Sequence, residues 1–494
     1  MITTICLNPC FDKTVEMDEL KLGEVNRIRR LRRDAGGKGM NVAVVAQRLG
    51  LEVQCIGTMG NDGATQLSEM MDAEGLKHRF LRVPGRVRTN LKLLLRNEKA
   101  GKQAAPVLPM DLSLYNNILV VGENATRSLT QGGGSSELKT LRDISPLEAL
   151  QSQASSLKPQ ISIDYAQGYA SGRAMYDHVD KVDPAVNAKL KAEALEKARK
   201  ADIIIYIGGL NKNHRQDCEN GDRESYDLPF GQNELIAELA TLKPKTAKLI
   251  VVTFGGNPYA TPWLQQVDAL VHCWYLGSEA GTSLVNVLTG KVNPSGKLPV
   301  TFAKNYSDYP YTSFGERAYP GLTGIEAPAN SAGEVPRRQV YYDEDLFVGY
   351  RGFDKLGLKA NFPFGFGLSY TTFQYDKPAI VRRADGSWQV TVSVTNTGSR
   401  EGKETVQLYV GQQRYAKTMK KPDFMVERPV KELKDFAKLS LKPGETKTAT
   451  FVITEGELAV WDETAHQWTT PAGKYRAYIG ASSADIRGTA DFTL

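Results

Sequence analysis

The chain has 494 residues, of which 41% are hydrophobic and 24% charged, a composition typical of globular domains with buried cores. Its net charge of +6 at pH 7 is small for this length and predicts no nucleic-acid partner. Five scattered cysteines form neither a disulfide framework nor a metal-binding pair, and we expect neither a bound metal nor a cofactor.

The first part of the chain alternates apolar runs with glycine-rich turns and a helical stretch. Apolar runs occur at residues 2–7 and 53–58, and a helical pattern at 42–49 follows the sequence AGGKGMN at 35–41. This alternation predicts an α/β fold for residues 1–92.

A second α/β region begins near residue 118. Its apolar runs lie at 118–122, 203–209, 249–254 and 269–274, with helical patterns at 185–200 and 232–242 between them. Continuous apolar runs are typical of parallel strands that are buried on both faces. The order predicts a parallel-sheet α/β sandwich domain over residues 93–380, in which the Pro-, Gly- and Tyr-rich segment 306–338 forms a long surface loop.

The pattern of apolar and polar residues changes after residue 373. Apolar and polar residues alternate in the segments 390–394, 405–410, 448–453 and 475–479, which are separated by turn sequences. This period of two predicts an all-β sandwich over residues 381–494.

Four motifs follow one another in residues 1–92. They are LNP with DKT at 7–14, AGGKGMNVA at 35–43, GTMGNDG at 57–63 and RTN at 88–90. In this order they resemble the start of the ribokinase-type sugar kinases, most closely the 1-phosphofructokinase branch. The resemblance implies a sugar-phosphate site that contains Asp12, Gly37, Lys38, Gly39 and Asn41, where close backbone approach, a lysine charge and a helix N-terminus favour an anion.

The kinase resemblance ends near Lys92. The Gly-Ala-Gly-Asp motif that supplies the nucleotide loop and catalytic base in that family does not follow. Because phosphoryl transfer depends on positioning and charge around the phosphates, we expect no kinase activity.

A second set of motifs extends to the end of the chain. It comprises VVGENA at 120–125, GGGS at 132–135, GSEAG at 277–281, GKVNPSGKLP at 290–299, VGYR at 348–351, FPFGFGLSYTTF at 362–373 and NTGSREG at 396–402. From residue 93 onward the chain is therefore similar to glycoside hydrolase family 3, of the β-glucosidase type. The resemblance implies the C-terminal α/β sandwich domain of that family, followed by a fibronectin type III-like domain.

The chemically important segment is DCENGDR at 217–223, which follows the apolar run at 203–207. It therefore lies at the carboxyl end of a strand, where open α/β sheets build sites. On composition alone Glu219 is one solvated acid in a polar loop, but the family resemblance makes it the general acid/base. We expect Asp222 and Arg223 to form an ion pair that anchors this loop beside the substrate. For His214 a sugar-lining role and a surface role both remain open.

Retaining hydrolysis needs a second carboxylate about 5–5.5 Å from the first. In family 3 this nucleophile is an Asp of the barrel domain, followed by Trp, and no Asp-Trp pair occurs in this chain. The 92 kinase-like residues stand where the family has its barrel. We therefore expect a β-glucosidase-like protein, with a β-glucoside-like carbohydrate as partner, that does not turn over glycosides alone.

Two other functions remain open from the sequence. One is a sugar-phosphate kinase based on residues 1–92, and the other is a non-catalytic carbohydrate-binding remnant of a glycosidase. The switch between resemblances at 90–95 indicates a joined gene or an assembly error. With no signal peptide and no membrane-spanning run we expect a cytoplasmic chain without a membrane partner, although the parent glycosidases are normally exported.

Overall fold

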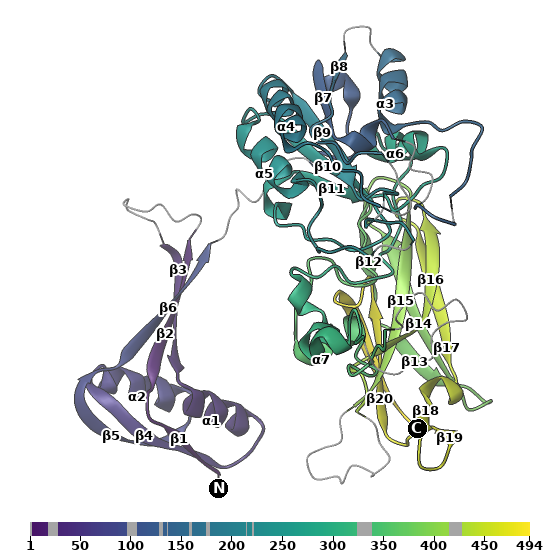
Figure 1. Ribbon diagram of the computed structural model, residues 1–494. Coiled ribbons are helices and arrows are strands. Elements are labelled where there is room, and N and C mark those ends of the chain that lie inside the picture. The colour runs from purple at the N-terminus through teal and green to yellow at the C-terminus, as the bar shows by residue number, and fades with distance from the viewer. Residues whose placement is uncertain are drawn as a thin grey trace. The chain divides into compact units, whose positions relative to one another are not determined.

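The computed structural model describes residues 2–17, 28–95, 106–127, 132–135, 137–157, 161–173, 178–213, 215–219, 222–323, 338–413 and 427–494. The chain folds as two compact units, Met1–Pro106 and Val107–Leu494 (Figure 1).

The first unit contains two three-stranded sheets and two helices. The parallel sheet has the order β1-β4-β5, with β1 (Ile2–Cys6), β4 (Val53–Asp62) and β5 (Lys77–Arg86). The other sheet has the order β3-β2-β6, with β2 (Cys10–Met17), β3 (Ile28–Gly36) and β6 (Arg88–Leu95). Helices α1 (Lys38–Arg48) and α2 (Ala64–Ala73) pack on the parallel sheet through a core that includes Met40, Leu67 and Cys55.

Strand β6 extends past position 92, where the family resemblance changes. Its backbone pairs in parallel with β2, with Val15 opposite Leu93 and Met17 opposite Leu95. Backbone hydrogen bonds form this pairing irrespective of side-chain identity. The first unit thus includes residues from both sides of the change in resemblance.

We expect the first unit to be the least stable part of the chain. Its parallel sheet has only three strands among the described residues, and Ile5, Leu7 and Leu81 are 64%, 71% and 69% exposed. An unpaired strand edge and uncovered apolar side chains lower local stability. Amide hydrogen exchange should therefore be much faster in β1 than in β9 (Ile203–Gly209) of the second unit. Equal protection of the two strands would contradict this expectation.

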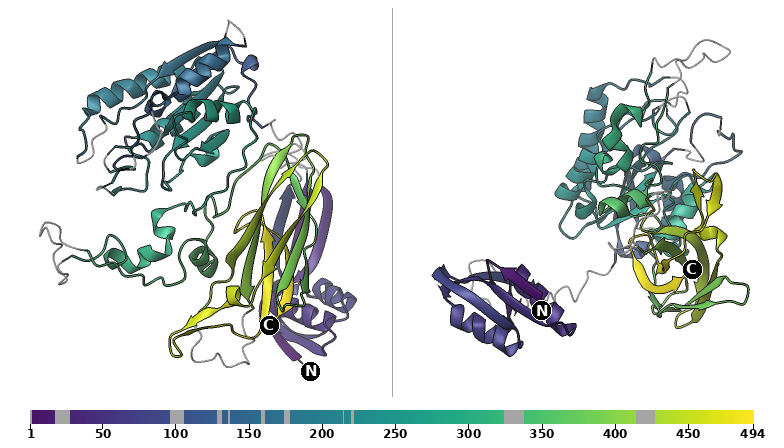
Figure 2. Two further views of the ribbon diagram at one scale, coloured as in Figure 1. Left: turned by 90° about the vertical axis from the view of Figure 1, so that its right-hand side faces the viewer. Right: turned by 90° about the horizontal axis from the view of Figure 1, so that it is seen from below.

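The second unit begins with a five-stranded parallel sheet, which confirms the predicted fold class. The strand order is β11-β10-β9-β7-β8. The remaining strands of this sheet are β7 (Asn117–Val121), β8 (Ser162–Ala166), β10 (Lys248–Phe254) and β11 (Ala269–His272). Helices cover both faces (Figures 1 and 2), namely α3 (Pro146–Ser155), α4 (Pro184–Ala198), α5 (Gln232–Leu242) and α6 (Ala280–Leu288).

Two apolar cores explain why this sheet is buried on both faces. One core contains Ile204 and Leu249 with side chains of α4 and α5. The other contains Ile205 and Ile250 with side chains of α6. Successive residues of a strand point to opposite faces, so a sheet covered on both faces requires the continuous apolar runs seen in the sequence.

An all-β sandwich follows, as predicted. One sheet joins β12 (Phe373–Tyr375), β13 (Ala379–Arg382), β14 (Trp388–Asn396) and β17 (Thr446–Ile453). The other has the order β16-β15-β20-β21, with β15 (Gly402–Gln412), β16 (Glu432–Leu441), β20 (Lys474–Gly480) and β21 (Ile486–Thr493). The hairpin of β18 (Val460–Asp462) and β19 (Gln467–Thr469) joins β17 to β20. Side chains from the two sheets meet in one core, and the long strands are visible in the left view of Figure 2.

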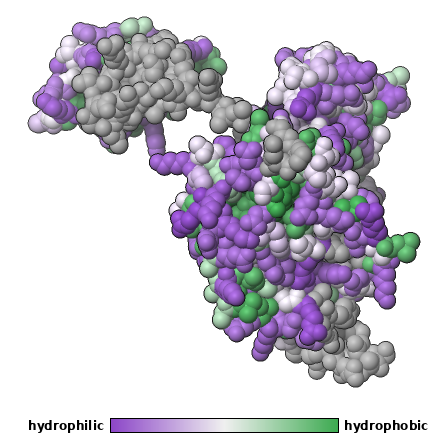
Figure 3. All heavy atoms as spheres, turned by 90° about the horizontal axis from the view of Figure 1, so that it is seen from above, coloured by the Kyte–Doolittle hydropathy of each residue, from purple (hydrophilic) through white to green (hydrophobic). Residues whose placement is uncertain are grey.

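Short helices occur in the connections between these elements. They are α7 (Tyr350–Leu356) and the 3-10 helices η1 (Leu112–Leu114), η2 (Glu123–Ala125), η3 (Leu264–Gln266), η4 (Tyr306–Asp308), η5 (Pro310–Arg317) and η6 (Gly456–Leu458). No helix among the described residues is both long enough and apolar enough to cross a membrane. The face drawn in Figure 3 is mainly hydrophilic, with apolar residues in small groups.

We expect His272 to make the stability of the second unit depend on pH. It ends β11 and packs against Tyr259, Trp274 and Phe302, and burial lowers its pKa to about 4. Between pH 6.5 and 4 the unfolded chain binds a proton that the folded chain excludes. Burial of neutral His272 therefore contributes fully to the free energy of unfolding above pH 6.5. As the pH falls from 6.5 to 4, the free energy of unfolding decreases by about 3 kcal/mol.

Urea unfolding at pH 7 and pH 4.5 measures this effect. His272→Phe should reduce the loss of stability between the two pH values. His466→Asn, at an exposed position, should leave the loss unchanged. An equal loss in wild type and His272→Phe would show that other groups cause it.

Candidate functional site

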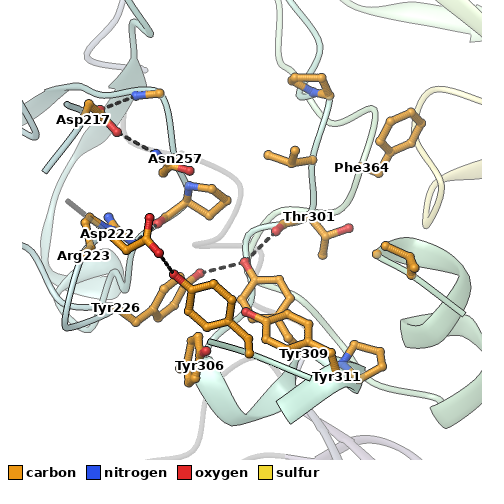
Figure 4. Close-up of a pocket in the computed structure, with 18 of the residues that line it drawn as sticks. Asp217, Asp222, Arg223, Tyr226, Asn257, Thr301, Tyr306, Tyr309, Tyr311 and Phe364 are labelled. Carbon is orange, nitrogen blue, oxygen red and sulfur yellow. Dashed lines mark hydrogen bonds between the residues drawn. The ribbon is translucent and has the colours of Figure 1, made fainter. Parts of the chain in front are cut away.

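A cavity of about 1200 Å³ opens in the second unit (Figure 4). Its walls include residues 216–219 and 222–226 after β9, residues 256–258 after β10, residues 299–301, parts of η4 and η5, and residues 347–351 at α7. The carboxyl ends of β9 and β10 thus face the cavity, as expected for a site in an open parallel sheet.

Asp217 clamps the loop that follows β9. Its carboxylate accepts hydrogen bonds from the Gly256 backbone N–H at 2.6 Å, the Asn257 side-chain amide at 2.6 Å and the Tyr275 hydroxyl at 2.7 Å. Figure 4 shows the first two of these bonds. Because the three donors follow β10 and β11, one carboxylate joins the loops of three adjacent strands.

Glu219 lies in the cavity wall, two residues beyond this clamp. The Ser135 backbone N–H donates to Oε2 of Glu219 at 2.9 Å, and the Ser135 hydroxyl also donates to the carboxylate. The glycine loop 132–135 can approach because Gly134 has no Cβ: a Cβ there would lie 2.8 Å from Oε2 of Glu219. The Gly133 N–H also donates to the Asp217 carbonyl at 2.8 Å. The GGGS sequence therefore holds both the carboxylate and its loop.

A buried polar network supports the start of the same loop. The side-chain amide of Asn124, which is fully buried, donates to the carbonyls of Gly208 at 2.9 Å and Leu210 at 3.0 Å. The Asn213 amide donates to the Ser171 carbonyl at 2.9 Å. These hydrogen bonds from buried side chains restrict the backbone and hold the direction in which the Glu219 loop leaves β9, while Oδ1 of Asn124 is buried without a hydrogen-bond partner among the described residues.

Asp222 and Arg223 both line the cavity, but the expected ion pair between them is wrong. The Tyr319 hydroxyl donates to Asp222 at 2.6 Å, and the Arg223 guanidinium donates to the Pro258 carbonyl at 2.7 Å. Each side chain thus has a partner from another loop. Burial lowers the pKa of Arg223. His214 lies outside the described residues.

A cluster of tyrosines forms another wall of the cavity, which was not among the predicted site residues. Tyr226, Tyr306, Tyr309, Tyr311 and Tyr319 all line the cavity. The Tyr226 and Tyr309 hydroxyls are 3.2 Å apart, and Figure 4 shows the rings close together. Burial raises the pKa of each of these two hydroxyls, so both remain protonated donors at neutral pH.

The start of this tyrosine segment was predicted to be a surface loop. It instead forms η4 and η5, while residues 324–337 of the predicted loop lie outside the described residues. The signal that could have revealed the wall is the density of tyrosine at 306, 309, 311 and 319. Aromatic residues at this density, beside polar groups, are typical of ligand pockets.

The predicted sugar-phosphate residues lie in the first unit. Gly37 is the N-cap of α1, with φ +129°, and Lys38, Gly39 and Asn41 form its first turn. Asp12 lies on the adjacent strand β2, where a Cβ on Gly36 would come within 2.7 Å of its carboxylate. The structure therefore brings Asp12 beside the glycine-rich sequence. Among the described residues, no group of three or more His, Cys, Asp or Glu side chains could hold a metal ion.

Two family profiles match the ends of the chain. The pfkB carbohydrate kinase profile matches residues 6–125, and the fibronectin type III-like domain profile matches residues 404–483. The fibronectin type III-like match agrees with the resemblance expected from the motifs, and the pfkB match extends beyond Lys92, where the kinase motifs end, to residue 125.

Relatives of known activity match the larger part of the chain. A β-glucosidase of Bacteroides ovatus is 44% identical over 403 residues, covering 81% of this chain and 50% of the relative. An exo-α-(1→6)-L-arabinopyranosidase of Bifidobacterium breve is 32% identical, covering 81% and 47%. The chain thus spans about half the length of these relatives.

Solved structures of β-glucosidases match the same part of the fold. The enzyme of Bifidobacterium adolescentis aligns with a TM-score of 0.64 at 32% identity, covering 78% of this chain and 50% of that one. The Thermotoga neapolitana enzyme in complex with glucose aligns with a TM-score of 0.62 at 27% identity, covering 78% and 51%. The profile of the glycosyl hydrolase family 3 C-terminal domain matches residues 93–370, more than half of the chain. The chain therefore belongs to glycoside hydrolase family 3.

Proposed function

We propose that the second unit is the acid/base half of a retaining β-glucosidase, with Glu219 as the general acid/base. The observation that supports this role most strongly is the position of Glu219 in the cavity wall, held by Ser135 on a loop that Asp217 clamps. The β-glucosidases among the matched relatives and structures support the reaction class.

In this proposal Glu219 acts twice. It first donates a proton to the glycosidic oxygen as the leaving group departs, and it then removes a proton from the water that attacks the glycosyl intermediate. The tyrosine wall offers ring faces to the sugar or its leaving group. Ser135 orients the carboxylate through two donors, so little reorganisation is needed when the proton moves.

We further propose that this chain does not supply the nucleophile. The other acidic residues in the described cavity wall are Asp217, Asp222, Glu224 and Glu344. Asp217 and Asp222 accept the hydrogen bonds described above, and Glu224 forms an ion pair with Arg215. Oε2 of Glu344 is buried. A retaining nucleophile lies about 5–5.5 Å from the acid/base, and the Asp-Trp sequence that carries it in family 3 does not occur in this chain.

The purified chain should therefore show no turnover of 4-nitrophenyl β-D-glucoside above buffer. Addition of a separately expressed family 3 barrel domain should restore turnover if it docks and completes the site. Hydrolysis by the chain alone that disappears in Glu219→Gln would instead require an internal nucleophile, with Asp12 the first residue to replace. Hydrolysis that persists in Glu219→Gln would indicate a contaminating enzyme.

The sugar preference can be tested in the same assay. Since one relative is an arabinopyranosidase, 4-nitrophenyl α-L-arabinopyranoside is the informative second substrate.

For the first unit we propose no phosphoryl transfer, because the chain lacks the Gly-Ala-Gly-Asp motif of the sugar kinase family. We expect no ATP consumption when the chain is incubated with fructose 1-phosphate, and measurable consumption would contradict this proposal.

A further inference from the structure

The hairpin β18–β19 carries an exposed pair of tryptophans. Trp461 and Trp468 lie directly opposite one another in the hairpin register, with ring centroids 5.7 Å apart and planes at 72°. They are 43% and 69% exposed. The other three tryptophans, Trp263, Trp274 and Trp388, are buried or half-buried. The hairpin pair is therefore unusual within this chain.

The hairpin presents this pair on a closed turn. Asp462 is only 7% exposed, and its Oδ1 accepts hydrogen bonds from the backbone N–H groups of Thr464 at 2.9 Å and Ala465 at 3.0 Å. Side chains alternate across a strand, so the buried Asp462 points inward and its neighbour Trp461 points outward. The turn is therefore ordered before a ligand binds, and binding on the tryptophan pair costs little conformational entropy of the protein.

A cross-strand tryptophan pair stabilises its own hairpin, but this role leaves a large part of the ring surface in water. At about 250 Å² for a whole tryptophan, the exposed fractions sum to about 300 Å². A stable protein interface needs about 800 Å² on each partner. The two rings alone supply less than half of this area, and an exposed aromatic surface of that size suits the stacking of sugar rings.

The acidic residues of this hairpin segment disfavour anionic ligands. Residues 455–473 contain four acidic residues and no Lys or Arg. Binding to anionic lipids or acidic polymers depends on basic side chains, so these partners would be repelled. Glu463 lies two residues after Trp461 and is exposed, which makes a carboxylate acceptor available for sugar hydroxyl groups.

From these observations we infer that the β18–β19 hairpin binds a neutral β-linked glucan chain by stacking on Trp461 and Trp468. A β-glucopyranose ring directs axial C–H bonds to both of its faces, and these bonds complement the negative face of an indole. In Figures 1 and 2 the hairpin lies at the end of the sandwich far from the parallel sheet β7–β11. This binding would not depend on the chemistry proposed for Glu219.

Affinity electrophoresis in gels that contain hydroxyethylcellulose tests the inference with the full chain. Wild-type protein should be retarded, and Trp468→Ala should weaken binding at least 10-fold. Trp468→Tyr, which keeps a ring, should retain binding within a few-fold. Phe436→Ala is the matched control, since Phe436 is a 62% exposed aromatic residue on β16 of the same sandwich, and its retardation should equal that of wild type.

If Trp468→Ala lowers the melting temperature, loss of binding in that variant could reflect unfolding. Titration of the wild-type protein with cellotetraose, followed by tryptophan fluorescence, then measures binding without the variant. Binding should persist in 0.5 M NaCl because the ligand is neutral. Absence of retardation of wild type, or unchanged binding in Trp468→Ala, would overturn the inference. Binding lost in Tyr311→Ala but kept in Trp468→Ala would assign the glucan to the cavity instead, and binding only to heparin or to phosphatidylglycerol vesicles would identify a different partner.

Discussion

Glu219→Gln is expected to lower hydrolysis of an alkyl β-glucoside by about 10²–10⁴-fold in the assay reconstituted with a family 3 barrel, the usual contribution of a general acid. An alkoxide is a poor leaving group and needs the proton that Glu219 would donate. A dinitrophenolate leaves without protonation, so cleavage of a dinitrophenyl β-glucoside should slow far less. The difference between the two substrates identifies proton donation, because a purely structural defect would slow both equally.

Exogenous azide provides a further check on this variant. An anion can replace the water that Glu219 would activate in the second step, so azide should accelerate Glu219→Gln on the dinitrophenyl substrate and yield glucosyl azide. The control is Glu316→Gln, an exposed carboxylate on η5 that does not line the cavity, and it should retain wild-type rates. Equal losses of Glu219→Gln on both substrates would show that Glu219 acts only in positioning.

Gly122→Ala should lower the free energy of unfolding by about 4 kcal/mol or more. Gly122 follows β7 with φ +123°, and a Cβ there would lie 2.1 Å from the carbonyl oxygen of Ile207 in the adjacent strand β9. Neither backbone can move without breaking the parallel pairing of β7 with β9. The shift would also disturb Asn124, which supports the Glu219 loop.

Two matched glycines separate the causes of this loss. Gly277 has φ +80°, and a Cβ at this position would have no atom within 4 Å, so Gly277→Ala should cost only the strain of a left-handed backbone, about 1 kcal/mol. Gly296 has open space and no positive φ, and Gly296→Ala should be neutral. Urea unfolding followed by circular dichroism measures all three. Similar midpoints for Gly122→Ala and Gly277→Ala would contradict the proposed clash.

Strands with a strong hydrophobic pattern were predictable from the sequence alone. The run at 203–209 became β9, and the alternating segment at 390–394 lies within β14. Weaker patterns were missed: β8 contains Asp164 between apolar residues, and β3 has the arginine-rich sequence IRRLRRDAG. These strands are defined by pairing with neighbours that are distant in the sequence, which local composition does not reveal.

The candidate site likewise has a part that the sequence predicted and a part that it could not. The family motif alone selected Glu219, and the position of its loop after an apolar run placed it at a strand's carboxyl end. Sequence could not assign the clamp to Asp217, because its partners Gly256, Asn257 and Tyr275 lie 39 to 58 residues away. It also paired Asp222 with Arg223 by adjacency, whereas each side chain bonds to a residue from another loop.

The sequence by itself therefore determined the fold class, the family resemblance and the candidate acid/base, since hydrophobic periodicity and short motifs are local properties of the chain. Only the tertiary structure decided the partners of the polar side chains and the tyrosine wall. Ser135 reaches Glu219 across 84 residues, and Tyr319 reaches Asp222 across 97 residues. Such hydrogen bonds join segments that are distant in the sequence, and their geometry is set by the packing of the sheet and helices beneath them.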